Sequence, residues 1–148
     1  MSLRAARDDD ARAIARAHVR AWRHAYADVL DPDVLAGLDV EERAAHWAAV
    51  LAAPDADTVV FDQDGFVAGF VSLRGDELVA LYVDPAAQGA GVGKILLARA
   101  EEQGACVATV FAANGHGRAF YEDHGWAEDG PAGESAGQPV VRYRCSSR

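Results

Sequence analysis

The chain has little positive charge and no long apolar run. It carries 14 Lys and Arg against 23 Asp and Glu, a formal net charge of −9. This balance argues against nucleic acid as a partner, because phosphate binding needs a basic surface. No apolar stretch approaches the roughly 20 residues that a membrane-spanning helix needs. The N-terminal segment MSLRAARDDD also lacks the apolar part of a signal peptide. We therefore expect a cytoplasmic protein with neither a membrane nor nucleic acid as its partner.

Cysteine is scarce as well. The two cysteines, Cys106 and Cys145, show neither the spacing of a metal site nor that of a disulfide framework. What the chain has in quantity is apolar residues, 51% of its 148 positions, which suffices for one domain with a two-layer core. We expect a single domain over residues 1–148 and no metal.

The most informative stretch runs over residues 77–103. Residues 77–84 alternate and are rich in Val and Leu, which predicts a strand. Residues 88–94 read QGAGVGK and predict a tight turn, and residues 95–103 predict a helix with Gly104 in the C′ position. A strand, a glycine-rich turn and a helix start together bind anions, because unpaired N–H groups and the positive end of the helix dipole converge there.

The spacing of the glycines excludes two common phosphate-binding loops. A P-loop would place its first glycine on Gln88 and its Ser or Thr on Ile95. The dinucleotide fingerprint G-x-G-x-x-G, begun at Gly89, ends on Lys94. The pattern that remains is Q-x-x-G-x-G over residues 88–93. An ordinary turn whose glycines serve packing is the alternative.

This pattern is similar to the pyrophosphate loop of the GNAT superfamily of N-acetyltransferases, [QR]-x-x-G-x-[GA], which holds acetyl-CoA. The preceding Tyr-Val-Asp-Pro and the following helix ILLARAEE strengthen the resemblance. The expected element order, β-α-α-β-β-β-α-β-α-β, matches this family along nearly the whole chain. The resemblance implies an α/β (α+β) fold with a mixed, mostly antiparallel twisted sheet. Its central parallel pair would be splayed apart, and helices would cover both faces.

The individual elements are expected from local patterns. We predict strands at residues 3–5, 58–61, 66–73, 77–84, 105–111 and 140–144. We predict helices at residues 8–29, 40–52, 95–103 and 116–124, with capping residues at Asp8, Asp9, Asp10, Asp39 and Asn114. Residues 34–38 are expected to form a turn or connector. Residues 129–138, rich in Gly and small polar residues, are expected to form a loop.

The resemblance implies a set of residues that hold acetyl-CoA. The backbone of the central strand would pair with the pantetheine arm, the glycine-rich turn would hold the pyrophosphate, and an asparagine would contact the arm. These positions are Leu81, Tyr82, Val83, Gln88, Gly89, Ala90, Gly91, Val92, Gly93, Lys94 and Asn114. A lysine in the first turn of a helix is often simply solvated, so a solvated Lys94 without a role in coenzyme binding is the alternative.

Residues 114–126 look like the family pattern N-x-x-A-x-x-F-Y-x-x-x-G-F, which places the family's tyrosine on Tyr121. The sequence differs from the family pattern at the alanine position, where it has Gly117 or Arg118, depending on the alignment. A tyrosine hydroxyl keeps its proton at neutral pH and can donate it to a thiolate leaving group. A tyrosine buried only for packing is the alternative.

Glu77 lies six residues before Val83, where family members with a glutamate base carry it. A base or a water relay is needed because an amine is mostly protonated at neutral pH. Glu77 could instead be a solvated turn residue, and His18 and Asp76 are weaker candidates.

The first predicted helix places His18, Trp22 and Tyr26 on one face, at i, i+4 and i+8. In the family the first two helices wall the acceptor cleft, so these residues would contact the acceptor. The alternative is that Trp22 and Tyr26 belong to the core, with His18 at its edge. The resemblance implies acetyl transfer from acetyl-CoA to a primary amine, directly, in a ternary complex. The acceptor would be a small-molecule amine or a peptide N-terminus or lysine, and a homodimer is possible. A net charge of −9 would steer cationic acceptors to the protein, but solubility alone also explains it. A non-catalytic acyl-CoA-binding sensor or regulatory module is the alternative function.

Overall fold

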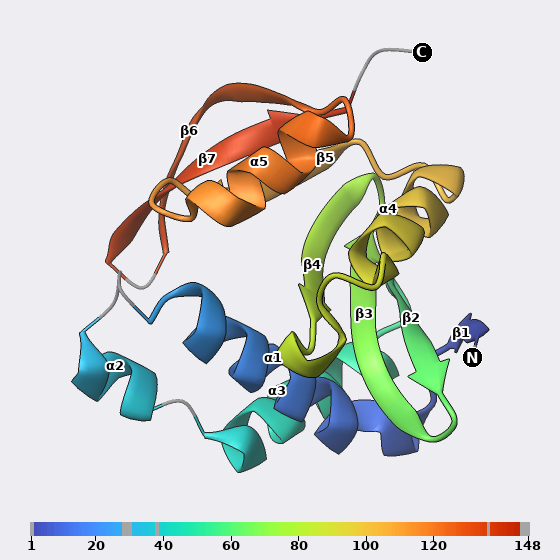
Figure 1. The fold of residues 1–148 in the computed structure, drawn as a ribbon. Helices are drawn as coiled ribbons and strands as arrows, with labels where there is room; N and C mark the ends of the chain where they lie inside the picture. Colours follow the sequence, from blue (N-terminus) through green and yellow to red (C-terminus); the bar gives the residue numbers. More distant parts are fainter. Residues whose placement is uncertain (1, 28–30, 38, 136, 146–148) are drawn as a thin grey trace.

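The fold was analysed in a computed structural model that describes residues 2–27, 31–37, 39–135 and 137–145 (Figure 1). The described strands form one seven-stranded sheet in the order β1-β2-β3-β4-β5-β7-β6. The strands are β1 (Ser2–Ala5), β2 (Ala56–Gln63), β3 (Phe66–Arg74), β4 (Glu77–Val83), β5 (Val107–Phe111), β6 (Ala127–Ser135) and β7 (Gln138–Arg144). The helices are α1 (Ala11–Ala25), α2 (Pro32–Ala36), α3 (Val40–Ala52), α4 (Val92–Glu102) and α5 (Gly115–Asp123).

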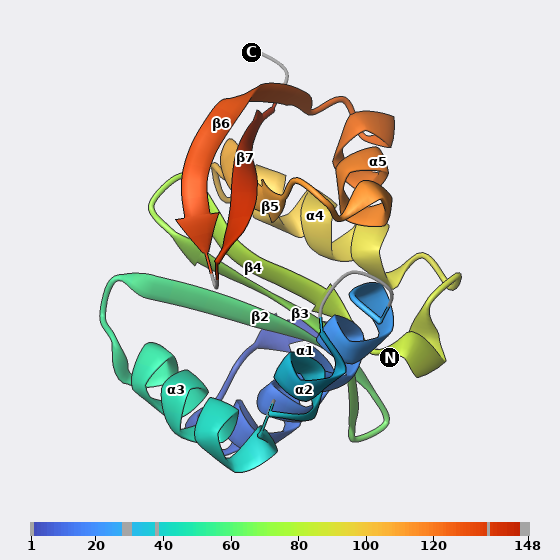
Figure 2. The ribbon, with the colours of Figure 1, turned by 90° about the vertical axis from the view of Figure 1, so that its left-hand side faces the viewer.

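Helices cover both faces of this sheet (Figure 2). On one face, Ile14 of α1 and Trp47 of α3 pack with Phe70 of β3. On the other face, Leu96 and Leu97 of α4 belong to a second buried cluster. Helices α1, α3 and α4 each turn an apolar stripe to the sheet, as a two-sided α/β arrangement requires. The predicted fold class is therefore confirmed.

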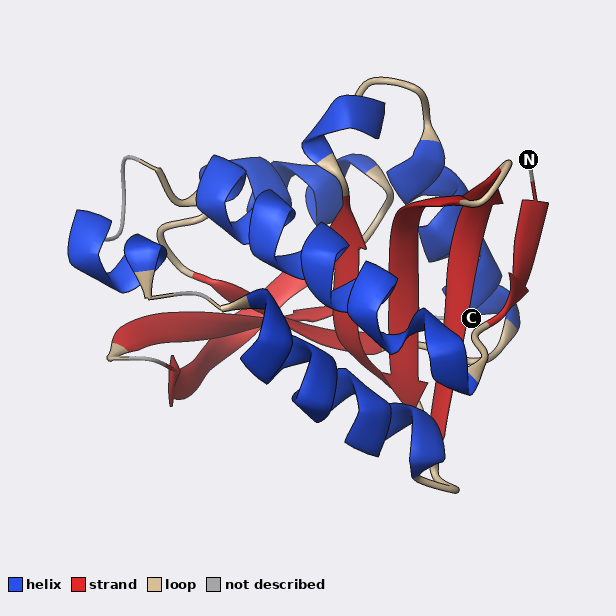
Figure 3. Cartoon of the chain, turned by 90° about the horizontal axis from the view of Figure 1, so that it is seen from below, coloured by secondary structure: helices blue, strands red, loops and turns tan. Residues whose placement is uncertain are grey.

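The sheet opens between its two central strands. Of the neighbouring strands described, β4 and β5 are parallel and all other pairs are antiparallel. The parallel pair is joined only at Glu77 with Val107 and at Leu78 with Ala108. Beyond Leu78, β4 continues to Val83 without a partner in β5, and the strands fan apart (Figure 3). The expected splay of the central pair is therefore present.

Most predicted elements occur, with shifted ends. The hairpin between β2 and β3 turns at Asp64 and Gly65, with φ of 54° and 91°, as expected for an Asp-Gly turn. Helix α4 begins at Val92 rather than at residue 95, because Gly91 ends the turn in the left-handed conformation. Residues 32–36 form the short helix α2 rather than a connector. Helix α1 is described to Ala25, and residues 28–30, where its end was predicted, lie outside the described residues.

The prediction of a loop at residues 129–138 is wrong. Most of it belongs to strand β6, which pairs antiparallel with β7. Gly130 and Gly133 have positive φ, and the pairing register shifts on either side of Pro131. Bulges with glycine and proline give a strand the composition of a loop. This strand forms because β7 supplies hydrogen-bond partners, which local sequence does not reveal.

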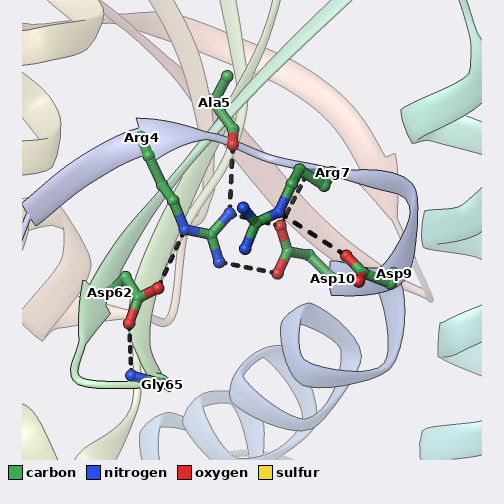
Figure 4. A network of polar contacts seen from close by, with 7 residues as sticks. All are labelled: Arg4, Ala5, Arg7, Asp9, Asp10, Asp62 and Gly65. Carbon is green, nitrogen blue, oxygen red and sulfur yellow. Dashed lines mark hydrogen bonds and ion pairs between the residues drawn. The ribbon is translucent and has the colours of Figure 1, made fainter.

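A charged network ties β1 to the start of α1 and to the β2–β3 hairpin (Figure 4). The Arg4 guanidinium donates two hydrogen bonds to Asp10, at 2.8 and 3.0 Å, and one to Asp62, at 3.0 Å. The backbone N–H of Arg7 also donates to Asp10, at 2.7 Å. Asp10 occupies the N-cap position of α1 but makes no capping bond there, because Arg4 and Arg7 bind its carboxylate. The Arg4 hydrogen bonds hold the pKa of Asp10 below its usual value.

The cysteine spacing gave no sign of a disulfide, yet the structure contains one. Cys106 and Cys145 form a disulfide with a Cα–Cα distance of 4.8 Å. The bond joins the residue before β5 to the residue after β7, and the N–H of Cys145 donates to the carbonyl of Cys106 at 2.9 Å. Sequence separation hides this pair, because strand pairing alone brings the two positions together. In the part of the chain that the structure describes, no helix is both long and apolar enough to cross a membrane.

Candidate active site

A cavity of about 910 Å³ occupies the opening between β4 and β5. Its walls come from α1, β4, the glycine-rich turn, the start of α4, β5 and α5, with single residues from β6 and β7. Ligand sites in open α/β sheets favour such a place, where neighbouring strands part and leave backbone groups unpaired. The sheet itself therefore builds the candidate site.

Strand β4 carries a bulge inside this cavity. Leu73 of β3 pairs with Leu78, whereas the preceding Ser72 pairs with Ala80, so Val79 is an extra residue. Leu78 and Leu81 pack on the α4 side, while Ala80 and Tyr82 pack on the α1 side. Val79 is 45% exposed and lines the cavity. A bulge re-aims the backbone, and because β5 has already diverged, β4 can pair here with an extended ligand.

The glycine-rich turn lies at the far end of β4. Gly89 and Gly91 have φ of 87° and 81°, which favours glycine. A Cβ added to either glycine would meet no heavy atom within 4 Å, so the space before these backbone positions is open. The first internal bond of α4 runs from Ile95 N to Gly91 O at 3.1 Å, which leaves the amides of residues 92–94 without a partner in the helix. An anion such as a pyrophosphate fits this open, amide-lined space.

Tyr121 of α5 lies in the cavity wall and is 7% exposed. Its ring packs against Trp126 and Tyr143. Among the described residues, its hydroxyl has no hydrogen-bond partner. Burial, followed by the nearby Tyr82 and Tyr26 hydroxyls, raises the pKa of Tyr121 above its usual value. The phenol therefore keeps its proton at neutral and moderately alkaline pH and is available to a ligand.

Asn114 connects helix α5 to helix α1. Its side-chain oxygen accepts a hydrogen bond from Gly117 N at 2.9 Å and thereby caps α5, as predicted. Its amide nitrogen donates to the Tyr26 hydroxyl of α1 at 3.1 Å. Gly117 allows this cap, because a Cβ there would come within 2.4 Å of the Asn114 amide nitrogen.

Aromatic rings bridge α1 to β5 across the opening. Trp22 and Tyr26 each contact Phe111 edge-on, with ring centroids 5.4 and 5.2 Å away. The Trp22 Nε1 donates to the Tyr82 hydroxyl at 2.7 Å. These contacts place α1 against the cavity. The wall at this point therefore consists mainly of aromatic rings.

His18 lies where α1, α3 and β4 meet. Its ring stacks on Tyr82 with centroids 4.4 Å apart, and its Nδ1 accepts a hydrogen bond from Trp47 Nε1 at 3.1 Å. Burial, reinforced by Arg43 and His46, lowers the pKa of His18 to about 4. His18 is therefore neutral near pH 7, and the bond from Trp47 places its proton on Nε2.

A smaller cavity of about 210 Å³ lies next to the first. The two cavities share His18, Val79, Ala80 and Tyr82. Trp47 and Val50 of α3 form the opposite wall. The smaller cavity therefore reaches the β4 bulge from the α3 side.

The structure brings most of the predicted site residues to the larger cavity. Those that line it are His18, Trp22, Tyr26, Leu81, Tyr82, Val83, Gln88, Gly89, Gly91, Val92, Gly93, Lys94, Asn114 and Tyr121. Ala90 and Glu77 are not among its described lining residues. Glu77 lies at the closed end of the β4–β5 pair, and Ala90 is exposed in the turn.

The sequence reasoning missed Phe111, the bulge residue Val79 and the role of Trp47. Local sequence predicts Phe111 only as part of a strand and Trp47 only as a core residue, and no local signal marks either as part of the site. The Val79 bulge depends on the register with β3, so only strand pairing reveals it.

A mixed sheet that opens between its parallel strands, with a glycine-rich helix start at the open end, defines the acyl-CoA N-acyltransferase fold. The family model of the acetyltransferase (GNAT) domain matches residues 36–147, and the chain belongs to this family. An uncharacterized N-acetyltransferase, YuaI of Bacillus subtilis, is 31% identical over 111 residues. That match covers 69% of this chain and 63% of YuaI, so it spans less than two thirds of the relative's length.

Solved structures show the same fold. The apo form of YjaB from Escherichia coli is similar with a TM-score of 0.76 and 22% identity, over 97% of this chain and 95% of YjaB. The PaiA N-acetyltransferase of Thermoplasma acidophilum, solved in complex with coenzyme A, has a TM-score of 0.72 and 17% identity. This second match covers 97% of this chain and 99% of PaiA.

Proposed function

We propose that the protein is an N-acetyltransferase that moves the acetyl group of acetyl-CoA directly to a primary amine in a ternary complex. One observation carries the proposal: β4 leaves β5 after two paired residues and ends at an open, amide-lined glycine turn. Family membership and the coenzyme A complex of PaiA support the same ligand. We propose that residues 1–148 act as one catalytic domain.

The chain would hold the coenzyme at two places. The backbone of Leu81, Tyr82 and Val83 would pair with the extended arm, since β5 leaves this edge of β4 unpaired. Gly89 and Gly91, with the amides that open α4, would bind the pyrophosphate. Gln88 and Lys94 line the cavity beside them and would add side-chain contacts, as would Asn114 at the arm. Bound there, acetyl-CoA supplies an acetyl group activated as a thioester.

Two side chains would handle protons. Tyr121 keeps a proton on its phenol oxygen, which it would donate to the leaving sulfur. Glu77 would accept the amine's proton, and because it lies outside the described cavity walls, we propose that it acts through a water molecule. The disulfide leaves neither cysteine as a thiol, which agrees with direct transfer rather than an acyl-cysteine route.

A non-catalytic acyl-CoA-binding module is less well supported. It would need the cavity and the glycine turn but would have no use for a buried phenol with an unpaired hydroxyl. Release of CoA that depends on an added amine separates the two functions.

Calorimetry tests coenzyme binding. We expect acetyl-CoA to bind with a micromolar dissociation constant, and Gly91→Leu to weaken it at least a hundredfold because a side chain would enter the open space. Gly104→Leu is the matched control, since Gly104 also has a positive φ (97°) and open space but lies at the other end of α4. Wild-type-like binding by Gly91→Leu would contradict the assignment of the turn.

A further inference from the structure

We propose that the acceptor is a small primary amine with an aromatic body and no second charge, bound in the smaller cavity between α3 and β4. The inference rests on the proposed acetyl transfer and names its substrate class. The smaller cavity shares Val79 and Ala80 with the larger one, so an amine held there meets the β4 bulge from the side opposite the coenzyme.

Most polar atoms in the buried walls of the smaller cavity have partners; His46, which also lines it, is an exposed residue of α3. Trp47 Nε1 donates to His18, and the Ser72 and Thr58 hydroxyls bond each other at 2.9 Å. The Tyr82 hydroxyl accepts from Trp22. A wall of this kind offers ring faces and aliphatic surface rather than hydrogen bonds, so it favours an apolar body.

The cavity walls also lack negative charge. The chain has 23 Asp and Glu, yet none of the described residues that line either cavity is acidic. The described walls therefore offer an ammonium group no carboxylate to pair with, and His18 is neutral near pH 7. Arg74, at the edge of the smaller cavity, is paired with Asp55 at 3.3 Å. A polyamine or aminoglycoside would leave its further ammonium groups unpaired there, which is costly in a desolvated site.

The volume sets the size of the acceptor. A cavity of about 150 Å³ lined by apolar side chains holds one benzene molecule. The smaller cavity, at about 210 Å³, therefore has room for one aromatic ring and a short aliphatic chain. An aralkylamine such as 2-phenylethylamine has this size, an apolar ring and a single amine.

Thiol release from acetyl-CoA tests the inference with four amines. We expect kcat/KM for 2-phenylethylamine to exceed that for spermidine, phenylalanine and ethylamine by at least tenfold each. Spermidine adds charge, phenylalanine adds a carboxylate, and ethylamine lacks the ring. A preference for spermidine or phenylalanine, or equal rates with ethylamine, would overturn the inference.

A cavity-filling variant tests the location. Val50 lines the smaller cavity and is half-buried, whereas the neighbouring Ala49 is exposed on the same helix. We expect Val50→Phe to raise KM for 2-phenylethylamine at least tenfold while acetyl-CoA binding stays within twofold, and Ala49→Phe to change neither. An unchanged KM in a folded Val50→Phe protein would place the acceptor elsewhere.

Binding without turnover keeps the inference separate from the proposed function. Calorimetry with CoA present should show 2-phenylethylamine binding to the wild type and at least tenfold weaker binding to Val50→Phe. Absence of acetyl-CoA binding by the wild type would defeat the proposed function itself. Coenzyme binding without any response to 2-phenylethylamine would defeat only the acceptor class.

Discussion

Arg20 Nε donates a hydrogen bond to Asp84 Oδ2 at 2.9 Å and so ties helix α1 to the end of β4. Asp84 is 1% exposed, and its other oxygen accepts a hydrogen bond from Ala86 N at 2.9 Å. This carboxylate thus caps the 3₁₀ turn Pro85–Ala87, which leads into the glycine-rich turn. Helix α1 and the segment that leads into the glycine-rich turn are therefore linked through one buried carboxylate.

Removal of Arg20 should leave that buried charge uncompensated. We expect Arg20→Ala to lower the free energy of unfolding by about 2 kcal/mol, since a buried carboxylate without its cation is costly. Arg16→Ala, at an exposed position of α1 with no partner among the described residues, should cost less than about 0.5 kcal/mol. Urea denaturation measures both, and equal losses in the two variants would show that Asp84 does not need Arg20.

The Tyr121 hydroxyl should matter for turnover rather than for binding. We expect Tyr121→Phe to lower kcat about a hundredfold or more, because a positioned proton donor contributes that much, while the acetyl-CoA dissociation constant stays the same. Tyr143→Phe is the control, since the Tyr143 hydroxyl donates to Glu122 at 2.6 Å and serves structure. It should lower stability but keep kcat. An unchanged kcat in Tyr121→Phe would remove the tyrosine from the mechanism.

Two variants distinguish the role of Glu77 from that of its acidic neighbour Asp76. If Glu77 draws the proton from the amine through water, Glu77→Gln should lower kcat/KM about a hundredfold at neutral pH. The loss should shrink as the pH rises toward the pKa of the amine. Asp76→Asn, one residue earlier, should have little effect. A pH–rate profile of Glu77→Gln that matches the wild type would favour a water chain without a dedicated base.

His18 should make stability depend on pH. Its pKa is about 4 in the folded protein and near 6.5 unfolded, so the unfolded chain binds more protons between these values. Stability from this group is therefore complete above about pH 6.5 and is lost as the pH falls toward 4, by about 2 kcal/mol at about pH 4.5. His18→Gln keeps an acceptor for Trp47 without titrating. Its urea midpoint should fall less between pH 7 and 4.5; parallel curves would contradict this role.

Reduction of the disulfide should weaken the β5–β7 half of the sheet. Cys106 and Cys145 are 39 positions apart, and the chain-entropy model gives a closed loop of this length up to about 4 kcal/mol. Urea denaturation with and without reductant measures the loss. The Cys106→Ser/Cys145→Ser variant should match the reduced protein and show no response to reductant. Equal midpoints for oxidised and reduced protein would mean that strand pairing alone holds this region.

The sequence alone determined the local structure at the open end of the cavity. The glycine turn, the flanking strand and helix and the Asn114 cap are local features. Each depends on the conformational preferences of a few neighbouring residues, so Gly91 and Asn114 could be placed before any coordinates. The antiparallel strands that lead into β4 and the helices on both faces follow from equally local patterns of polarity. Glu77 and Tyr121 were proposed from motif spacing, and their roles stay predictions.

Tertiary structure decided the rest, because it depends on which distant residues become neighbours. Strand β6 exists because β7 pairs with it, although its own glycines and proline are typical of a loop. The disulfide follows from the β5–β7 register, and the Val79 bulge follows from the register with β3. The smaller cavity needs α3, β3 and β4 together, and the neutral state of His18 needs their combined burial. Local sequence encodes the preferences of single elements, whereas cavity shape, charge state and cross-strand bonds arise only once the elements pack.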